Sequence, residues 1–472
     1  MDRVEAAHAL HAFEVSEGLL KTKIDGRVPW QLVRALVFYR MADLPLSRPV
    51  GRGSKLIFYN ALLSSLSLLR ASLSAKRFGC VFVRMSSDYY DQAGVSKNYI
   101  LDSLIQSCPE HFIVEKINAW SKMVRQRKYA IPYHLSFDFF ELASYPFLLF
   151  YRNKKINDFT SHLSVRLQAE LDVEIDPRLL SRVICGVYIK ARVLSIFFRA
   201  VAPSLVIIAN TGEYALLLAC KMIGLRCLEI QHGIINMYHP DIIPAVEGVS
   251  PTDLLLPDDM ALFGDYWIDQ LNESILIKES MHAVGRELID YCRERPRLIY
   301  EDYWNYSVLV TSQGLDTECL VDWIRRFVLH IPGAYRVLVN IKLHPIYDIC
   351  VEKFSDLKEF ENIRLIPASA EPSTLDVLAS SDFHVSISSA CHYDSLGLGK
   401  PTFILPLKGS EWILNLVDNR TVFSPSSPAD LWRMMLSYRS GVINSDFYYR
   451  PGAVENLRTL VETLSSSLGS RG

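Results

Sequence analysis

The sequence lacks the features that define several classes of protein. No uninterrupted apolar run reaches the roughly 18 to 20 residues that a membrane-spanning helix requires. The 9 cysteines are odd in number and never spaced as CxxC, unlike those of a disulfide framework or a zinc knuckle. The opening segment MDRVEAAHALHAF has no basic stretch followed by an apolar one, so we expect no secretory signal peptide. These absences predict a protein of the reducing cytoplasm.

An excess of charge of one sign is also lacking. With 50 Lys and Arg residues against 52 Asp and Glu, the formal net charge is -2, so we expect no nucleic-acid partner, and any anion site must be local. The 472 residues exceed what one hydrophobic core usually serves, and 50% of them are hydrophobic. The sequence therefore predicts two well-packed domains with a cleft between them.

Familiar phosphate and metal motifs are missing from the candidate site loops. Neither GxGxxG nor GxxxxGK[ST] occurs there. Asp258 and Asp259 form a bare acidic pair in a proline-containing loop, which we expect to be solvated surface rather than a metal-binding DxD motif. Other groups must hold any phosphate.

Short apolar runs rich in β-branched residues alternate with helical stretches from residue 205 onward. This order is typical of βαβ units around a parallel sheet. Two similar runs, 80–84 and 112–115, precede a helix-rich region. The expected strands of the later part are 205–209, 227–230, 307–311, 336–341, 363–366, 383–386 and 402–405.

We expect the domain boundary within 272–296, where the charged run YCRERPR separates two groups of strands. The predicted domains are an N-terminal Rossmann-like domain with a helical extension, 1–285, and a C-terminal Rossmann-like domain, 296–445. Residues 446–472 contain a helical stretch that we expect to cross back onto the N-terminal domain.

Two apolar segments with basic flanks have two interpretations. Residues 56–69 read LIFYNALLSSLSLL between Lys55 and Arg70, and residues 145–155 read YPFLLFYRNKK. Each is either a buried core helix or a helix that lies on an anionic membrane leaflet.

Two polar loops follow strands of the N-terminal domain, at the sheet edge where open parallel sheets bind ligands. NTGEY follows strand 205–209, and QHG ends the next strand. Glu213 either stabilises the first turn of a helix or acts as a general base. His232 is either a structural histidine or a group that exchanges protons near neutral pH.

In the C-terminal domain, TSQGLDTE follows the first strand. Gly314 permits a tight turn, and Asp316 lies where a helix should begin. Asp316 either caps this helix or presents its carboxylate to a ligand in the cleft.

KLHP follows the next strand and predicts an anion site. Lys342 supplies a positive charge, and His344 supplies a proton donor. Pro345 should start a helix whose free amides and dipole point at the same place. SISSA, after a further strand, adds the hydroxyls of Ser388 and Ser389.

Taken together, QHG, KLHP and SISSA followed by GLGKP resemble the landmarks of GT-B-fold glycosyltransferases that make bacterial surface polysaccharides. The resemblance covers about 205–407 and is greatest to enzymes that use CMP-activated acidic sugars, namely sialic acid and 3-deoxy-manno-octulosonic acid (Kdo) transferases. It implies an α/β fold of the GT-B type, with two Rossmann-like domains facing a central cleft. It also implies that neither a metal nor another cofactor is needed.

The resemblance assigns roles to these residues. In those families the His-Pro histidine and a serine pair bind the CMP phosphate, which places His344, Ser388 and Ser389 at that phosphate. Apart from the resemblance, Asp394 lies about one turn into the helix after SISSA, where we expect it to accept a ribose hydroxyl. The carboxylate on the C-terminal domain of some Kdo transferases corresponds to Asp316 or Glu318, and we expect Asp316 to face the reacting sugar carbon. The expected nucleotide site comprises Gln313, Gly314, Lys342, His344, Pro345, Ser388, Ser389 and Asp394, and the expected catalytic residues are Glu213, His232, Asp316 and His344.

The predicted function is transfer of a sugar from a nucleotide donor, CMP-Kdo or a related CMP-activated acidic sugar, to a glycan or lipid-linked glycan acceptor. The site of transfer would be the cytoplasmic face of the inner membrane. The Asp-Asp-Gly motif of several sialyltransferase families is missing, which disfavours sialic acid. Three alternatives stay open: a CDP-glycerol-type polymer transferase, a sugar-nucleotide epimerase of the same fold, and a non-catalytic GT-B-like scaffold in polysaccharide assembly.

Overall fold

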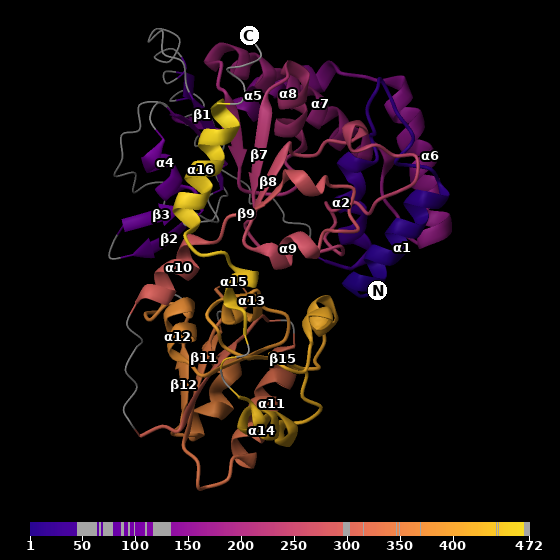
Figure 1. The fold of residues 1–472 in the computed structure, drawn as a ribbon. Coiled ribbons are helices and arrows are strands. Elements are labelled where there is room, and N and C mark those ends of the chain that lie inside the picture. The colour runs from indigo at the N-terminus through magenta and orange to yellow at the C-terminus, as the bar shows by residue number, and fades with distance from the viewer. Residues whose placement is uncertain are drawn as a thin grey trace.

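The chain forms two α/β lobes, each built around its own sheet, as the computed structural model shows (Figure 1). The structure describes residues 1–44, 64–65, 68, 79–85, 89–92, 95–98, 100–108, 111–116, 134–295, 303–314, 316–345, 347–348, 350–368, 370–439, 441 and 443–466.

The N-terminal lobe contains a seven-stranded sheet in the order β5-β4-β1-β6-β7-β8-β9. All neighbouring strands are parallel. The chain first adds β4 and β5 on one side of β1 and then adds β6 on the other side. The carboxyl ends of β1 and β6 therefore flank a topological switch point. The strands are β1 (Cys80–Met85), β4 (His111–Lys116), β5 (His134–Ser136), β6 (Leu205–Ile208), β7 (Arg226–Ile230), β8 (Asp259–Leu262) and β9 (Met281–Ala283).

The C-terminal lobe contains a six-stranded sheet in the order β12-β11-β10-β13-β14-β15, again with parallel neighbours. Its switch point lies between β10 and β13. The strands are β10 (Tyr306–Thr311), β11 (Val337–Lys342), β12 (Ile363–Ile366), β13 (Phe383–Ser386), β14 (Thr402–Ile404) and β15 (Val422–Phe423). Nearly every residue of β10, β11 and β13 is buried, as expected for a sheet that helices cover on both faces.

Helices of the N-terminal lobe pack mainly around α7 (Pro177–Val201), which contacts α2, α5, α6 and α8. Its start is fixed by Pro177 and by the side chain of Asp176, which accepts a hydrogen bond from the Arg178 amide at 2.8 Å. The other elements of this lobe are α1 (Arg3–Ser16), α2 (Gln31–Met41), the hairpin β2 (Tyr89–Gln92) and β3 (Val95–Asn98), α4 (Asp102–Ser107), α5 (Asp138–Phe150), α6 (Lys154–Leu171), α8 (Tyr214–Ile223), η3 (Pro251–Asp253), α9 (Asp265–Asp269), η4 (Lys278–Ser280) and α10 (Glu287–Glu294).

Helices of the C-terminal lobe are shorter. They are α11 (Thr317–His330), η5 (Val351–Glu359), α12 (Thr374–Ser380), α13 (Cys391–Gly397), η6 (Ser410–Leu416) and α14 (Pro428–Ser437). The chain then passes through α15 (Ser445–Tyr448) and ends the described part with α16 (Ala453–Ser466).

The segment around α15 joins the two lobes. The indole of Trp267 donates to the Tyr448 carbonyl at 3.0 Å, and the Arg450 amide donates to the Phe263 carbonyl at 2.8 Å. Gly264 is needed at this crossing, because a Cβ there would lie 2.5 Å from the Phe447 carbonyl oxygen. Beyond the crossing, α16 lies on the N-terminal lobe and packs against α4 and β6 (Figure 1).

The nine strands expected from the sequence are all present, within two residues at each end. Segment 272–296, where we expected the domain boundary, contains β9 and α10, and β9 belongs to the N-terminal sheet. The expectation that Asp258 and Asp259 form a solvated pair was wrong for Asp259. This residue is buried at the start of β8, where its carboxylate pairs with Arg226 Nε at 2.7 Å and His282 Nε2 at 3.0 Å.

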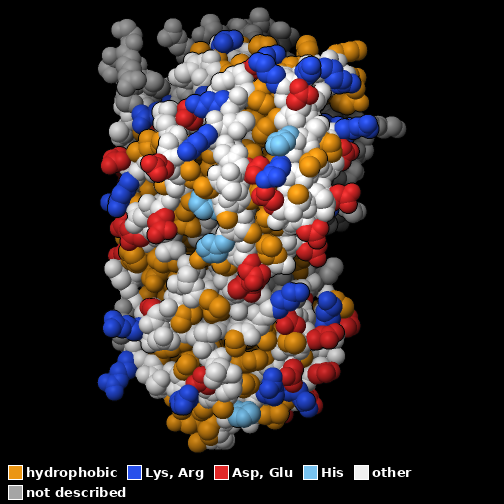
Figure 2. All heavy atoms as spheres, turned by 90° about the vertical axis from the view of Figure 1, so that its right-hand side faces the viewer, with side chains coloured by type: hydrophobic (Ala, Val, Ile, Leu, Met, Phe, Trp, Pro, Cys, Tyr) orange, Lys and Arg blue, Asp and Glu red, His pale blue; other side chains and the backbone are white. Residues whose placement is uncertain are grey.

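One of the two apolar segments with basic flanks can be assessed. Most of 56–69 lies outside the described residues, whereas 145–150 is the second half of α5 and is exposed. No described helix is both long and apolar enough to span a bilayer. Figure 2 shows acidic and basic side chains interspersed on one face of the molecule, in keeping with the near-zero net charge.

Candidate functional site

A cavity of about 770 Å³ lies between the two lobes. One wall is made by the loops that follow β10, β11 and β13, and therefore by the switch point of the C-terminal sheet. The opposite wall is made by α1, α2 and the loop after β7. A cavity of this size is within the range of sites that bind nucleotide-sized ligands.

Gln313 and Ser388 tie two loops of the C-terminal wall together. Gln313 Oε1 accepts hydrogen bonds from the Ser388 amide at 2.8 Å and the Ser388 hydroxyl at 3.1 Å. Ser389 Oγ accepts from the Cys391 amide at 3.2 Å, at the start of α13. All three predicted residues line the cavity, and Gln313 fixes how the serine loop sits beside it.

Gly314 also lines the cavity, in a turn held by Asp348. The glycine has φ +67, and a Cβ at this position would lie 2.5 Å from Tyr347 Cβ. Asp348 accepts from the Gly314 amide at 2.7 Å and from the Thr317 hydroxyl at 2.8 Å. Sequence reasoning missed Asp348, although it lies only four residues after His344 in HPIYD.

His344 lies on the same wall with a defined tautomer. Its amide donates to Ser312 Oγ at 3.0 Å, and its ring is stacked on Tyr347 with the ring centroids 4.7 Å apart. The Tyr347 amide donates to Nδ1 at 3.2 Å, so the ring proton is on Nε2. Burial lowers the pKa of His344, which keeps the ring neutral near pH 7.

Pro345 and Lys342 both line the cavity, but the local structure at Pro345 and the partners of Lys342 differ from those expected. No helix starts at Pro345, which lies in a turn, and the next helical element is the 3₁₀ helix η5 from Val351. Helix-terminal amides are therefore not aimed at the His344 ring. The Lys342 ammonium donates to three carbonyls, those of Pro367 at 3.1 Å, Ala370 at 2.6 Å and Pro372 at 3.0 Å. These bonds commit the lysine to holding the 367–372 loop instead of a ligand.

Asp394, for which the sequence predicts a bond to a ribose hydroxyl, lines the cavity and also has protein partners. Its Oδ1 accepts from Arg286 Nη1 at 2.6 Å and from the Tyr449 hydroxyl at 2.6 Å. Arg286 comes from the N-terminal lobe and Tyr449 from the crossing segment, so Asp394 joins the lobes at the edge of the cavity.

Asp316 does not line the cavity. It is the N-cap residue of α11, but its side chain makes no cap hydrogen bond, and neither function foreseen for it is evident. The reason is local: Asp348, not Asp316, satisfies the turn and the Thr317 hydroxyl.

Glu213 and His232 lie near the switch point of the N-terminal sheet, outside the lining of the cavity. Glu213 is buried at the N-cap of α8 and accepts from Asn210 Nδ2 at 3.0 Å. Burial, aided by nearby His239, lowers the pKa of His232 to about 4. Burial also raises the pKa of neighbouring Glu229 to about 8. This part of the site is therefore poor in water and holds His232 neutral.

His239 was not singled out from the sequence. This residue lines the cavity, unlike Glu213 and His232. The Asp241 amide donates to His239 Nδ1 at 3.3 Å, and Asp241 Oδ2 lies 3.9 Å from the same nitrogen. Asp241 Oδ1 accepts from the Tyr214 hydroxyl at 2.8 Å. The signal was present in the sequence, because MYHPD contains a second His-Pro pair shortly after QHG.

Gly212 of NTGEY makes room for Asp241. It has φ +81, and a Cβ there would lie 2.9 Å from the Asp241 carboxylate. The absence of a side chain at Gly212 thus lets the Asp241 carboxylate pack directly against the NTGEY backbone.

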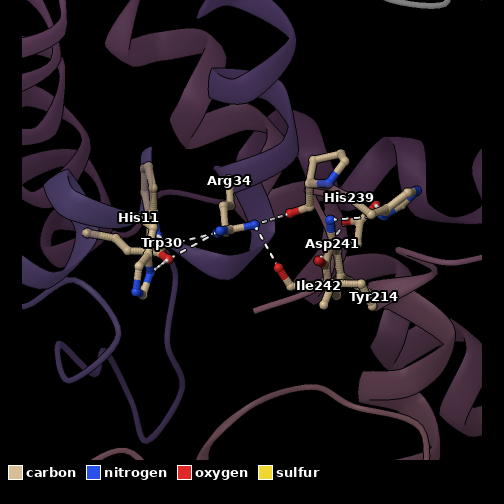
Figure 3. Close-up of polar contacts among 9 residues, drawn as sticks. His11, Trp30, Arg34, Tyr214, His239, Asp241 and Ile242 are labelled. Atoms are coloured by element: carbon tan, nitrogen blue, oxygen red, sulfur yellow. Dashed lines mark hydrogen bonds and ion pairs between the residues drawn. The ribbon is translucent and has the colours of Figure 1, made fainter. Parts of the chain in front are cut away.

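A buried ion pair in the N-terminal helices supports the same loop (Figure 3). Arg34 Nη1 donates to the carbonyls of Pro240 and Ile242, on either side of Asp241. Glu14 accepts from Arg34 Nε at 2.7 Å and from the Trp30 indole at 2.8 Å. Burial alone would raise the pKa of Glu14, but the Arg34 charge and these hydrogen bonds outweigh burial and lower it.

No metal site is evident in the part of the chain that the structure describes, where no cluster of three or more His, Cys, Asp and Glu side chains is suitably arranged.

Comparisons with known proteins bear on the fold. No family model matches the chain, and no curated protein matches its sequence. Among solved structures, UDP-GlcNAc 2-epimerase from Methanocaldococcus jannaschii is similar with a TM-score of 0.51 at 10% identity, over 82% of this chain and 99% of that one. The wall teichoic acid polymerase TagF gives 0.43 at 9% identity, over 88% and 99%. A glycosyltransferase from Rickettsia africae gives 0.42 at 12% identity, over 84% and 97%.

The likeness to the epimerase, together with the two parallel sheets on either side of a shared cavity, shows an α/β fold of the GT-B type. The fold class predicted from the sequence is confirmed.

Proposed function

We propose that this chain is a glycosyltransferase that moves a sugar from a nucleotide donor to a glycan acceptor bound in the same cavity. The observation that carries the proposal is the composition of that cavity. His344, Gln313 and the serine pair come from one lobe, and His239 comes from the other. Two facing walls with different hydrogen-bonding groups suit a reaction between two substrates.

The C-terminal wall is the proposed donor site. Neutral His344 carries its proton on Nε2, and Ser389 Oγ accepts from the Cys391 amide and keeps its proton for a ligand. With the Ser388 hydroxyl turned from Gln313 toward the ligand, all three lining residues would form an uncharged cradle for phosphate oxygens. Gln313, Gly314, Lys342, Pro345 and Asp394 would shape this wall. We propose a CMP-activated acidic sugar such as CMP-Kdo as the donor.

The N-terminal wall is the proposed acceptor site. The acceptor hydroxyl would attack the anomeric carbon while the bond from that carbon to the phosphate oxygen breaks, and the phosphate would leave with the electron pair. His239 would take the hydroxyl proton after a change of tautomer, because its Nδ1 accepts from the Asp241 amide in the structure and its Nε2 therefore carries the ring proton. It would do so at Nε2 in the tautomer whose Nδ1–H turns to Asp241 Oδ2, now 3.9 Å away. Glu213 and His232 would support this wall from outside its lining.

The proposal is tested by incubating the protein with a panel of nucleotide sugars and glycan acceptors and measuring released CMP, CDP and UDP. We expect CMP to be released, and His344→Ala to weaken CMP binding at least tenfold. His330→Ala, which changes an exposed histidine on α11, is the control and should bind CMP normally. Full nucleotide affinity in His344→Ala would refute the donor assignment.

The same assay separates the alternatives. Release of CMP from CDP-glycerol, with glycerol phosphate transferred to the acceptor, would identify a polymer transferase. Conversion of the donor to an isomer without an acceptor would identify an epimerase. Absence of binding of CMP, CDP and UDP would favour a scaffold.

We further propose peripheral contact of the protein with an anionic membrane through α5. Phe147 is 62% exposed and Phe150 is 83% exposed, and Arg152, Lys154 and Lys155 follow directly. Exposed aromatic side chains beside basic ones suit the headgroup region of a bilayer. This contact would bring the cavity to a lipid-linked acceptor at the cytoplasmic face.

A further inference from the structure

The acceptor side of the cavity contains a positive charge that the proposed reaction has not used. Arg3 lies at the start of α1, where the N-terminus reaches the junction of the lobes (Figure 1), and it lines the cavity. Its guanidinium carbon lies 5.1 Å from the ring centroid of Trp412, a residue of η6. Arg3 is therefore held over an aromatic face contributed by another part of the chain.

The other charged groups of the lining are already paired. The Lys342 ammonium donates to three carbonyls, and Arg286 pairs with Asp394, the only carboxylate among the described lining residues. Arg3 has no carboxylate partner in the described part of the chain. The carboxylates of Asp2 and Glu5, its neighbours in α1, bond to backbone amides in a capping box and do not line the cavity.

A hydrogen-bond donor accompanies this charge. Tyr39 of α2 lines the same wall. Burial and the Asp241 carboxylate raise its pKa, although Arg3 opposes them, so the phenol keeps its proton. The guanidinium can only donate hydrogen bonds, and the protonated phenol beside it can donate one more, a combination that favours an anion.

We propose that the acceptor is anionic and that Arg3, with Tyr39, binds its carboxylate or phosphate group. The inference rests on the proposed function, because it assigns the N-terminal wall to the acceptor. It adds a substrate class: a glycan with a uronic or other acidic sugar, or one with a sugar phosphate, in place of a neutral glycan. A planar, always charged guanidinium suits bidentate contact with either group.

The test uses the whole chain saturated with CMP and compares three probes: glucuronate, glucose 6-phosphate and glucose. Isothermal titration calorimetry should give at least tenfold tighter binding of one anionic sugar than of glucose. Whichever anion binds more tightly identifies the charged group of the acceptor. Arg3→Gln should abolish the preference, and Arg3→Lys should restore part of it.

Arg40→Gln is the matched control, because Arg40 is an exposed cation on the same helical pair and does not line the cavity. It should keep the full preference. Equal binding of all three sugars, or an unchanged preference in Arg3→Gln, would overturn the inference. Circular dichroism of each variant shows whether a loss of binding reflects a loss of folding. If Arg3→Gln does not fold, the anion preference of Arg3→Lys is compared with that of wild type instead.

A failure of the acceptor inference can be distinguished from a failure of the proposed function. Failure of CMP to bind would count against the donor site, and the anion preference would then be measured on the unliganded protein. Normal CMP binding without an anion preference would leave the donor site standing and remove only the acceptor assignment.

Discussion

At the scale of single residues, a buried histidine pair lies beneath the donor wall. His384 contacts Thr311 Oγ1 at 3.0 Å and Thr402 Oγ1 at 2.8 Å, and His392 Nδ1 contacts the same Thr402 hydroxyl at 2.6 Å. Both rings are fully buried. Burial lowers the pKa of His392 to about 3, and it also lowers that of His384, helped by His392.

These shifts predict a loss of stability in acid. The folded-state pKa is below the unfolded value of about 6.5, so the unfolded chain binds the proton first as the pH falls. The contribution of His392 is fully present above that value and declines toward pH 3. Its slope should be about 1.4 kcal/mol per pH unit.

Urea unfolding at several pH values between 7 and 4 measures this slope. Subtracting the curve of His392→Gln from that of the wild type removes the contributions of other groups, including buried Glu229. Parallel curves for the two proteins would show that His392 is not the group that titrates.

The sequence predicted the residue types of the donor wall better than their partners. Ser388, Ser389 and His344 line the cavity because they follow strands whose carboxyl ends share one edge. Lys342 and Asp394 follow strands at the same edge, yet their charges are taken up by loop carbonyls and by Arg286. Which partner a side chain finds depends on contacts distant in sequence, and no local pattern encodes them.

At the scale of elements, the Glu14–Arg34 pair connects α1 and α2 to the His239 loop. Both side chains are almost fully buried, so removing one charge leaves the other unpaired. Glu14→Gln should lower the free energy of unfolding by about 3 to 5 kcal/mol. It should also weaken acceptor binding, because Arg34 holds the carbonyls beside Asp241.

The control for Glu14 is Glu17, whose pair with Arg166 is more exposed. Glu17→Gln should change stability far less, since water screens that pair. Denaturant unfolding compares the two variants directly. Equal losses would mean that the buried pair has no special part in the N-terminal helices.

Helix α5 gives a second prediction at this scale. The double variant Phe147→Ser and Phe150→Ser should reduce sedimentation with vesicles rich in phosphatidylglycerol at least fivefold, because it removes the exposed aromatic rings. Leu329→Ser, at a 63% exposed position on α11, is the matched control and should sediment like wild type. Strong binding to neutral phosphatidylcholine vesicles would contradict a role for the basic residues.

Nine strands were foreseen from the sequence, including the 3-residue β14, whereas β5, β8, β9 and β15 were not. The strands β5, β9 and β15 have only 3, 3 and 2 residues, which leaves only a short apolar run to recognise. Strand β8 begins with Asp259, whose charge suggested a solvated loop until Arg226 and His282 were seen to neutralise it. The prediction of a helix start at Pro345 was also wrong, because proline permits a helix start without requiring one.

At the scale of the whole molecule, the lobes meet both around α15 and at η6, which contacts α1 and whose Trp412 lies against Arg3. Trp267 of the N-terminal lobe packs on Tyr393 of α13 with ring centroids 4.6 Å apart, and Tyr266 packs on Tyr448 at 4.9 Å. The Arg286–Asp394 ion pair also joins the two lobes, beside these aromatic contacts. Any closure of the cavity around two substrates would have to preserve or rearrange the contacts at both places.

The return of the chain through α16 leads to a prediction about the domains. We propose that α16, the described helix of the predicted segment 446–472, belongs to the N-terminal domain in energetic terms. Leu457, Val461 and Leu464 pack in one cluster with Phe82 and Leu205 of the N-terminal sheet. Leu457→Ala should cost about 2 to 5 kcal/mol and weaken the hydrogen-exchange protection of β6 while leaving β10 unchanged.

Leu431→Ala is the mirror experiment, because Leu431 of α14 packs with Val308 and Val339 in the C-terminal core. It should weaken the protection of β10 and leave β6 unchanged. If either variant lowered the protection of both strands equally, the contacts between the lobes would be strong enough to make the two lobes unfold as one unit.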